Sequence, residues 1–570
     1  MALKKSTIFL QNACLQHRYI RSQDLSNIVE RPERLRAVNI GLAAAISHLE
    51  DLLPDASGTD SSTTSGDPSD LATALNKMTL ESDSKSLKIP VIQSEAKVDI
   101  LQNPAVKFIH GDIDGDVYLE TLQKWVKESF NKVTEGGSEI PEGYSQGDLY
   151  LCPESLNAIE GALGTICEAV DTVLSKSFER AFVAIRPPGH HCGEDTPSGF
   201  CFVNNVAVAA AHGNGTQSIV WQINEETYRQ TLEQEAGSPT ADRPGAQIYY
   251  GSIHDILSYP CEDGKPELVQ AASTSIHNAH GQFIENIHLQ TYTSEEHFWT
   301  ELYEKRYKQI LHKSQEFLDA TGGPGDDVLI FISCGMDACE HEYESMSRHN
   351  RKVPASFYYR FARDACALSD KYAGGRIISV LEGGYSDRAL ISGSMAHFVG
   401  LTDLPESVKA DESWWSVENL IELEKATKKR RGGRPSLPAA GSTRQWIERS
   451  LAILAPLDST AASVVSSLRA PPSAPTMTLR DRTKPAKTPA PASSPQRSTR
   501  GKASTSTSKP KAKGRPSKGG DTLEAPIKFE PISSGSSNEG ETSAPAAAPE
   551  QKKLPRVVLK LGKPQPSDAS

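Results

Sequence analysis

Two adjacent histidines, His190 and His191, are the residues whose types and spacing most directly suggest chemistry. They follow an apolar run at residues 181–185 and stand in a loop rich in Gly and Pro. Open α/β sheets place their reactive groups in loops at the carboxyl ends of strands. An imidazole changes its charge near neutral pH, so two of them in such a loop predict a site for proton transfer.

Two later segments also place polar residues after an apolar run. Asp337 follows the run at 328–333, and Gly384 and Tyr385 follow the run at 376–381. A carboxylate, an imidazole pair and a phenol are what metal-assisted amide hydrolysis needs: a metal ligand, an acid and base, and a donor to the oxyanion. A histidine pair alone is more often an ordinary loop feature, whereas three matching strand ends favour an active site.

The elements that must position these groups alternate between strands and helices. Strands are predicted at 7–10, 106–110, 181–185, 247–254, 284–292, 328–333 and 376–381, and helices at 32–46, 154–176, 204–211, 294–321, 356–372 and 414–425. The run at 181–185 is apolar without alternation, which suits a parallel strand covered on both faces. The fold class predicted is α/β, with a doubly wound, mostly parallel sheet and helices on both faces.

The charge is divided between an acidic body and a basic tail. Residues 1–424 carry 34 Lys and Arg against 62 Asp and Glu, whereas residues 425–570 carry 27 against 10. The tail is rich in Pro, Ser, Thr, Ala and Lys, so we expect it to be disordered apart from an isolated amphipathic helix at 445–454. A basic tail points to a polyanionic partner, either nucleic acid or an acidic protein face.

Within the tail, residues 429–435 and 511–516 carry Gly-Arg-Pro beside basic residues. Such segments are similar to AT-hooks, which lay an arginine into the narrow minor groove of A·T-rich DNA. A generic basic linker or nuclear-import signal is an equal alternative. In the body, residues 54–88 are predicted to be a disordered insertion. The Asp-rich loop at 112–116 lacks the closing Glu of an EF-hand, which favours a solvated or substrate-rim loop over a calcium site.

Cysteine usage and hydropathy limit the class of protein. The nine cysteines include no C-x-x-C pair, which favours a reducing compartment over a disulfide framework. No stretch approaches the roughly 18 apolar residues of a membrane span. Secretion and membrane insertion are therefore not expected.

Several segments together resemble the signatures of the zinc-dependent histone deacetylases. They are residues 30–35, 186–205, 212–217, 333–338 and 381–385. The segment 253–260 and the basic tail resemble a fungal class-II-like branch of that family. The resemblance implies a deacetylase domain at 1–425 with the arginase/deacetylase fold, a tail at 426–570, and hydrolysis of acetyl-lysine to lysine and acetate.

The resemblance also assigns catalytic roles to residues of this sequence. His190 and His191 match the paired imidazoles that act on the zinc-bound water and on the leaving amine. Asp337 matches a carboxylate ligand of the zinc ion. Tyr385 matches the phenol that donates a hydrogen bond to the developing oxyanion.

Three more residues are assigned to substrate binding by the same resemblance. Phe200 matches a wall of the narrow channel that grips the acetyl-lysine stem. Gly384 lets the backbone approach the substrate closely, since glycine has no side chain. Asp148 is a candidate rim carboxylate that holds the substrate backbone.

The sequence departs from the family pattern at one junction. The family has a further strand that ends in Asp-x-Asp-x-His-His, but here the helix predicted at 204–211 runs directly into His212 and Gly213. The omission removes an Asp and a His that ligate zinc, and a second Asp that orients one imidazole. Because catalytic zinc sites normally have three protein ligands, Asp337 alone is not expected to hold a catalytic zinc ion.

These observations leave alternative functions. The intact residues around Asp337 and Tyr385 favour an ordinary zinc-dependent deacetylase from which a short segment at 211–213 has been excised. The alternative is a catalytically inactive deacetylase-like scaffold, and an enzyme for small acetylated amines is disfavoured by the basic tail. The resemblance implies acetylated histones or other proteins as partners, a corepressor-type complex, DNA contact through the tail, and a location in the nucleus or also the cytoplasm.

Overall fold

The computed structural model describes residues 5–52, 88–111, 117–214, 220–237, 245–405, 407–428, 444–466 and 468. Four predictions fall outside these residues, wholly or nearly so. They concern the insertion at 54–88, the Asp-rich loop at 112–116 and the Gly-Arg-Pro segments at 429–435 and 511–516.

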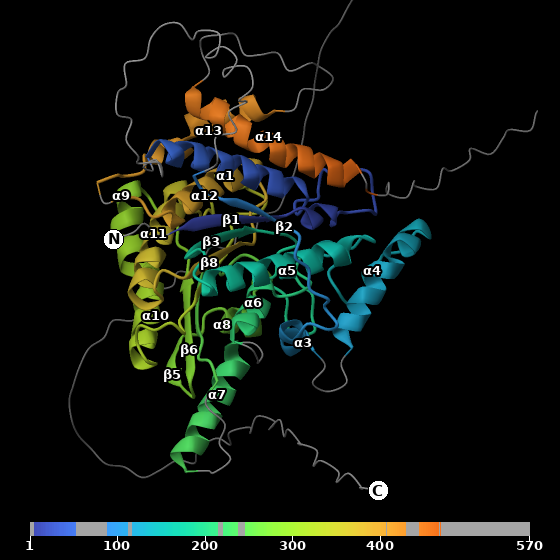
Figure 1. Cartoon of the computed structure of the whole chain (residues 1–570). Helices are drawn as coiled ribbons and strands as arrows, with labels where there is room; N and C mark the ends of the chain where they lie inside the picture. Colours follow the sequence, from blue (N-terminus) through green and yellow to red (C-terminus); the bar gives the residue numbers. More distant parts are fainter. Residues whose placement is uncertain are drawn as a thin grey trace, which may run out of the picture. The chain divides into compact units, whose positions relative to one another are not determined.

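A five-stranded parallel sheet forms the centre of the body (Figure 1). Its strand order is β2 (Val91–Ser94), β1 (Ser6–Gln11), β3 (Arg180–Ala184), β8 (Ile377–Leu381) and β7 (Ile330–Cys334). Every residue of β1, β3 and β8 is buried, as unalternating apolar strands require when helices cover both faces. The predicted α/β class with a parallel sheet is therefore confirmed.

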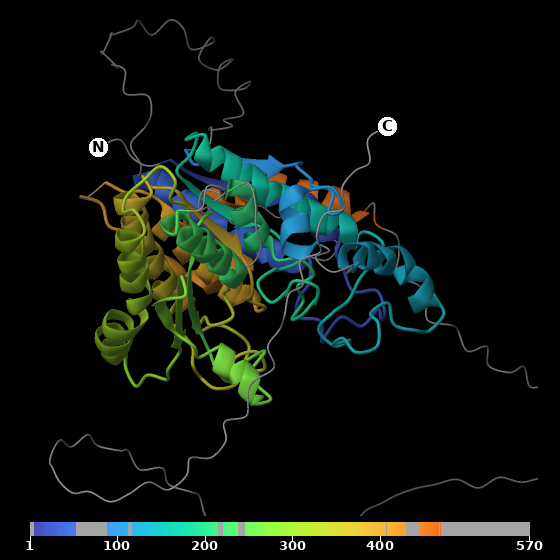
Figure 2. The same ribbon diagram turned by 90° about the horizontal axis from the view of Figure 1, so that it is seen from below.

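Helices cover both faces of this sheet (Figures 1 and 2). One face carries α1 (Glu33–Leu52) and α12 (Asp387–Leu401), and the opposite face carries α5 (Ser155–Leu174) and α6 (Asn205–Asn214). The other helices of the described residues are η1 (Asn12–Gln16), α3 (Pro104–His110), α4 (Tyr118–Thr134), α7 (Val220–Glu235), α8 (Pro266–Ala271), α9 (Glu295–His297), the π-helix η3 (Phe298–Tyr307), α10 (Gln309–Ala320), α11 (Ala355–Tyr372), η4 (Glu412–Trp415), α13 (Val417–Thr427) and α14 (Gln445–Ser466).

A separate three-stranded sheet follows α7 in the chain. Its order is β4 (Tyr249–His254), β6 (Gln282–His288) and β5 (Ile276–Ala279), with β4 parallel to β6 and β5 antiparallel to it. Between β3 and β4, the described residues form α6 and then α7, with no strand between them. The alternation of strand and helix therefore stops at the junction where the family pattern has one more strand.

The last strand of each sheet has an open edge. β7 ends the larger sheet and β4 ends the smaller one, so within the described part of the chain each has a strand partner on one side only. The apolar residues Ile330, Phe331 and Ile332 of β7 are half-buried, unlike the buried strands beside it. An apolar edge without charged or proline residues is unusual, because such edges readily pair with other strands.

The segment predicted as a strand at 106–110 is a helix, α3, so that prediction is wrong. The Asn103 side chain caps the helix by accepting hydrogen bonds from the backbone N–H groups of Ala105 and Val106. Pro104 occupies the first helical position, where its fixed φ is favourable and its missing N–H costs nothing. The local capping residues therefore override the strand propensity of a short apolar run.

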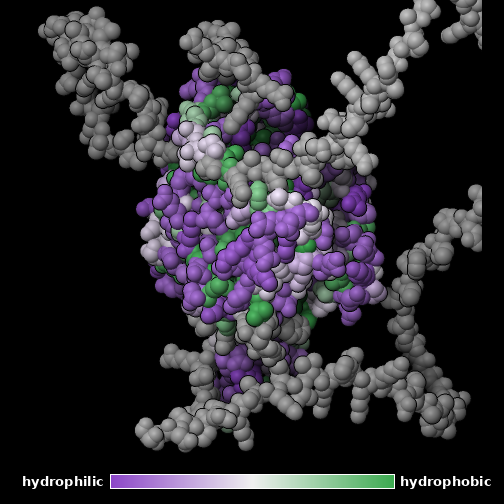
Figure 3. All heavy atoms as spheres, turned by 90° about the vertical axis from the view of Figure 1, so that its right-hand side faces the viewer, coloured by the Kyte–Doolittle hydropathy of each residue, from purple (hydrophilic) through white to green (hydrophobic). Residues whose placement is uncertain are grey.

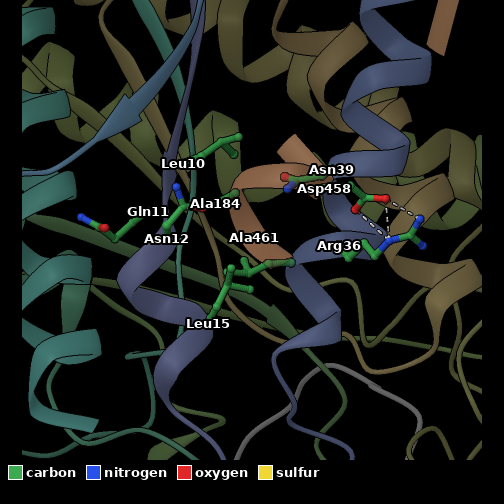
Figure 4. A pocket seen from close by; sticks show the side chains of 10 residues that line it. Leu10, Gln11, Asn12, Leu15, Arg36, Asn39, Ala184, Asp458 and Ala461 are labelled. Atoms are coloured by element: carbon green, nitrogen blue, oxygen red, sulfur yellow. Dashed lines mark hydrogen bonds and ion pairs between the residues drawn. The ribbon is translucent and has the colours of Figure 1, made fainter. Parts of the chain in front are cut away.

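Helix α14 is longer than predicted and is not isolated. It runs to Ser466 and packs on α1, where the Asp458 carboxylate accepts a 2.8 Å hydrogen bond from Arg36. Between α14, α1 and the carboxyl ends of β1 and β3 lies a cavity of about 30 Å³ (Figure 4). Such a volume holds one or two water molecules and is far too small for a peptide ligand.

The surface agrees with the hydropathy of the sequence. The face in Figure 3 is mostly hydrophilic, with hydrophobic residues scattered singly or in small groups. Among the described residues, no helix has the length and apolar character needed to cross a bilayer.

The stack that joins α1 to the carboxyl-terminal helices gives a pH prediction. The buried His48 ring lies between Trp414 at 4.4 Å and Trp446 at 4.6 Å, and burial lowers the pKa of His48 from 6.5 to about 4. The unfolded chain therefore takes up a proton at His48 first, and stability is lost as the pH falls from 6.5 to 4.

Replacing His48 with phenylalanine should keep the stack and remove this loss. As the pH falls from 6.5 to 4, the parent should lose up to about 3 kcal/mol of its free energy of unfolding through His48, whereas His48→Phe should not lose this contribution. Urea denaturation at both pH values measures it. An unchanged difference between the two proteins across that range would show that His48 is not held uncharged.

Candidate functional site

The predicted site residues follow three neighbouring strands. β3, β8 and β7 are parallel and adjacent, with Val183 paired to Val380 and Cys334 paired to Leu381. Their carboxyl ends therefore meet at one edge of the sheet. The histidine pair follows β3, Asp337 follows β7, and Tyr385 follows β8.

A buried glutamate that the sequence analysis did not single out holds the first histidine. The Nδ1 atom of His190 lies 3.0 Å from Oε2 of Glu382, whose side chain is 1% exposed. Desolvation lowers the pKa of His190, but the Glu382 carboxylate outweighs that effect, so the pKa lies above its usual value. The His190 side chain is 37% exposed and so remains open to a reactant.

The second histidine lies beside the first in a drier setting. The ring centroids of His190 and His191 are 4.0 Å apart. Burial, together with the charge on His190, lowers the pKa of His191 to about 2. His191 therefore stays uncharged across the neutral range.

Tyr259 forms an aromatic wall that the sequence analysis did not assign to the site. Its ring meets the His191 ring edge-on at 4.9 Å, and its hydroxyl hydrogen-bonds Ser198. A Cβ atom on Gly199 would lie 2.7 Å from the Tyr259 ring, so this close contact needs glycine, which also has a φ of +50°. In the sequence, the segment 253–260 that contains Tyr259 indicated only a resemblance to one branch of the family and no role in the site.

Tyr385 and Phe200 lie together near the same strand ends. Their ring centroids are 5.5 Å apart, and the Arg34 guanidinium lies 5.0 Å from the centre of the Tyr385 ring. Burial raises the pKa of Tyr385, so its hydroxyl keeps its proton. The Glu342 carboxylate accepts a 2.7 Å hydrogen bond from the backbone N–H of Tyr385, which fixes the turn.

The glycines of this turn allow close approach of neighbouring groups. Gly384 has a φ of +102°, and a Cβ atom there would lie 2.7 Å from Cβ of Met336. A Cβ atom on Gly383 would lie 2.5 Å from Oδ1 of Asp337. The Asp337 carboxylate therefore packs directly on the turn that presents Tyr385.

Asp148, the candidate rim residue, is half-buried and accepts a 2.7 Å hydrogen bond from Ser145. Burial raises the pKa of Tyr259, and the Asp148 charge adds to that rise while Ser198 opposes it.

A buried ion network supports the start of the histidine loop. Glu30 accepts hydrogen bonds of 2.8 and 2.6 Å from Arg186, one of 3.0 Å from Arg34 and one of 2.6 Å from the Tyr150 hydroxyl. The side chains of all three charged residues are 0% exposed. Arg34 also donates to the Gly384 carbonyl at 2.6 Å, so the network links the loops after β3 and β8.

The donor set does not fit a catalytic zinc ion. Among the described residues, no group of three or more His, Cys, Asp or Glu side chains is arranged to hold a metal ion. Asp337 is the candidate ligand that lies at the strand ends. His212 is instead in α6, where its Nε2 atom pairs at 3.0 Å with the exposed Asp171 of α5.

Comparisons with known proteins point to one family. A family model described as histone deacetylase domain matches residues 115–401. The chain is 33% identical to histone deacetylase HOS3 of Saccharomyces cerevisiae over 461 residues, covering 73% of this chain and 59% of the relative. It is 30% identical to type-2 histone deacetylase 2 of Dictyostelium discoideum, over 42% of this chain and 13% of that protein.

Among solved structures, the HDA15 HD domain aligns with a TM-score of 0.41 and 15% identity, over 81% of this chain and 99% of that one. Both curated relatives are longer than the matched part: the chain spans less than two thirds of the length of either.

Proposed function

This chain belongs to the histone deacetylase family, within a fungal class-II-like branch, and from that premise we propose that its catalytic domain is that of a protein-lysine deacetylase, active once the segment missing at 211–213 is in place. The reaction is hydrolysis of the acetyl-lysine amide to lysine and acetate. The observation that carries the proposal is the Glu382–His190 pair beside Tyr385 at the ends of adjacent strands. The names of the relatives favour this function over an inactive scaffold.

His190 is the proposed proton carrier. Its Nδ1 atom is engaged by Glu382, so Nε2 is the nitrogen left to take a proton from the attacking water and return it to the leaving amine. A pKa raised above the usual histidine value suits donation to an amine near neutral pH. Uncharged His191 does not compete for that proton.

Tyr385 is the proposed donor to the oxyanion. Its hydroxyl keeps its proton because burial raises its pKa, and the nearby Arg34 guanidinium adds positive potential. A fixed donor of this kind stabilises negative charge that develops on the acetyl oxygen. We propose that Phe200 and Tyr259 are the aromatic contacts of the acetyl-lysine stem. Gly384 is proposed to line the same channel, and Asp148 to lie at its rim.

Zinc chemistry is a property of the family, and in a family member the ion supplies an electrophile and an acidic water. The described residues of this chain offer Asp337 as a ligand and do not complete a site. We therefore assign no step to zinc in this chain. Turnover is expected to need an added segment at 211–213 with the missing ligands.

Acetate release from an acetyl-lysine peptide tests the proposal on two forms of the protein. One is the present chain, and the other carries an apolar strand segment ending in Asp-x-Asp-x-His between Ala211 and Gly213, called here the strand-restored form. We expect acetate from the strand-restored form and none above background from the present chain. A strand-restored form that folds and holds zinc but releases no acetate would refute a deacetylase function.

The partners follow from the same proposal. Acetylated histones or other acetyl-lysine proteins are the proposed substrates, in the nucleus and also the cytoplasm. We propose that the body includes α14 and that the basic tail beyond it contacts DNA or a corepressor-type complex. The charge of residues 467–570, with 19 Lys and Arg against 8 Asp and Glu, supports a polyanionic partner.

A further inference from the structure

Glu382 makes an unusual set of contacts for a side chain next to a catalytic loop. One oxygen, Oε2, lies 2.8 Å from the backbone N of Gly189, 3.3 Å from that of His190 and 3.0 Å from His190 Nδ1. The other oxygen accepts a 3.3 Å hydrogen bond from the Ser333 hydroxyl. Both carboxylate oxygens are thus used, and the side chain is 1% exposed.

The chemistry of these donors decides which ring nitrogen carries hydrogen. Backbone N–H groups only donate, and an ionised carboxylate only accepts. The pKa of Glu382 lies below its usual value because His190 and the two backbone N–H groups outweigh the effect of burial. Because Oε2 can only accept, the Nδ1 atom of His190 must carry the hydrogen of this bond.

Three hydrogen bonds keep Glu382 itself from moving. Its backbone N–H donates to the Cys334 carbonyl at 3.0 Å, and its carbonyl accepts from the buried Arg34 guanidinium. Ser333 holds the second carboxylate oxygen from the neighbouring strand β7. The carboxylate is therefore part of the rigid edge of the sheet, and a support of this kind can fix the direction of the imidazole.

We propose that Glu382 is the positioning residue for His190: it fixes the imidazole with Nδ1–H toward the protein and Nε2 toward the reactant. This role rests on the proposed deacetylase function. It matters in this chain because the segment that would supply an orienting Asp to one imidazole is missing. Glu382 orients His190 from β8, a strand that the chain retains.

A purely structural role is the competing explanation. In that case, Glu382 would serve only to anchor the backbone of Gly189 and His190, and the tautomer of the ring would not depend on it. The two roles differ in one observable, the position of the imidazole hydrogen. Ring nitrogen chemical shifts report this position and do not require turnover.

The test is NMR of the full chain labelled with ¹⁵N in the histidine rings, at a pH where His190 is uncharged, with the His190 signals assigned by loss in His190→Gln. We expect the Nδ1–H tautomer in the parent and in Ser333→Ala. In Glu382→Leu, which has a similar volume but no acceptor, the Nδ1–H fraction should fall at least about two-fold, whereas Glu382→Gln, whose amide oxygen still accepts, should retain most of it. Circular dichroism checks that each variant is folded.

The outcomes separate this proposal from the deacetylase proposal. An unchanged Nδ1–H fraction in a folded Glu382→Leu variant would overturn the positioning role, whatever the activity. Suppose that the tautomer changes as expected, but a zinc-loaded strand-restored form releases no acetate. The positioning of the ring would then be established, and the deacetylase function would be refuted. Loss of the Nδ1–H tautomer in Ser333→Ala alone would transfer the role to Ser333.

Discussion

Replacing Glu30 with glutamine is expected to lower the free energy of unfolding by about 3–5 kcal/mol, the cost of removing one member of a buried ion network. Arg186 and Arg34 both donate to Glu30, and all three side chains are 0% exposed. Without the carboxylate, two guanidinium groups would keep their positive charges in the interior. Their mutual repulsion and lost hydration are the physical cause of the loss.

Urea denaturation followed by tryptophan fluorescence measures this change. The matched control is Glu128→Gln, since Glu128 pairs with Lys132 on the surface and the two side chains are 41% and 37% exposed. Exposed pairs contribute little, so the control should change stability by less than about 0.5 kcal/mol. A loss below about 1 kcal/mol for Glu30→Gln would show that the network is not a main support of the histidine loop.

Replacing Tyr385 with phenylalanine is expected to lower kcat of the strand-restored form by about 100- to 1,000-fold with little change in KM. The hydroxyl is proposed to donate a hydrogen bond mainly in the transition state, where charge develops on the acetyl oxygen, and donors of that kind have effects of this size. The ring itself packs on Phe200 and beneath Arg34, and phenylalanine retains both contacts. The fold should therefore be unaffected.

Steady-state acetate release from an acetyl-lysine peptide gives both constants. Tyr250→Phe is the matched control, because Tyr250 is 46% exposed and belongs to β4 of the smaller sheet. It should retain the full rate. A Tyr385→Phe variant with parental kcat would remove Tyr385 from the mechanism, and an increase in KM alone would assign it to substrate binding.

The sequence predicted the centre of the fold well because local patterns determine it. The apolar run at 181–185 became the buried parallel strand β3, the run at 376–381 became its neighbour β8, and the run at 328–333 became β7 on the far side of β8. At residues 106–110 the apolar pattern misled, because the cap at Asn103 starts a helix there. The helix at 445–454 also extends further than its apolar spacing indicated, since α1 provides a surface for it.

The site could be predicted in outline because parallel strands bring their carboxyl ends together. The supporting contacts could not, since they join residues far apart in sequence. Glu30 meets Arg186 across 156 positions, and Glu382 meets His190 across 192. A lone glutamate in an apolar segment has no spacing signal, and its partner becomes visible only when β8 lies beside β3.

The break at residues 211–213 has a physical counterpart in the sheet. α6 leads to α7 among the described residues, β7 and β4 each end a sheet, and the apolar side chains of β7 are half-buried. A further parallel strand beside β7 would cover its open edge and bring its own carboxyl end to the side of the sheet where Asp337 lies. The structure of the edges therefore agrees with the loss of metal ligands that the sequence pattern indicates.

The central claim is that this chain keeps the proton-transfer residues of a deacetylase site but lacks most of its zinc ligands. The most direct test is to measure the zinc content of the purified chain after dialysis against metal-free buffer. Because Asp337 is the candidate ligand that the described strand ends present, we predict well below one zinc ion per chain by mass spectrometry. One tightly held zinc ion per chain, lost on replacing Asp337 with alanine, would contradict that prediction and show that this sequence completes a metal site by itself.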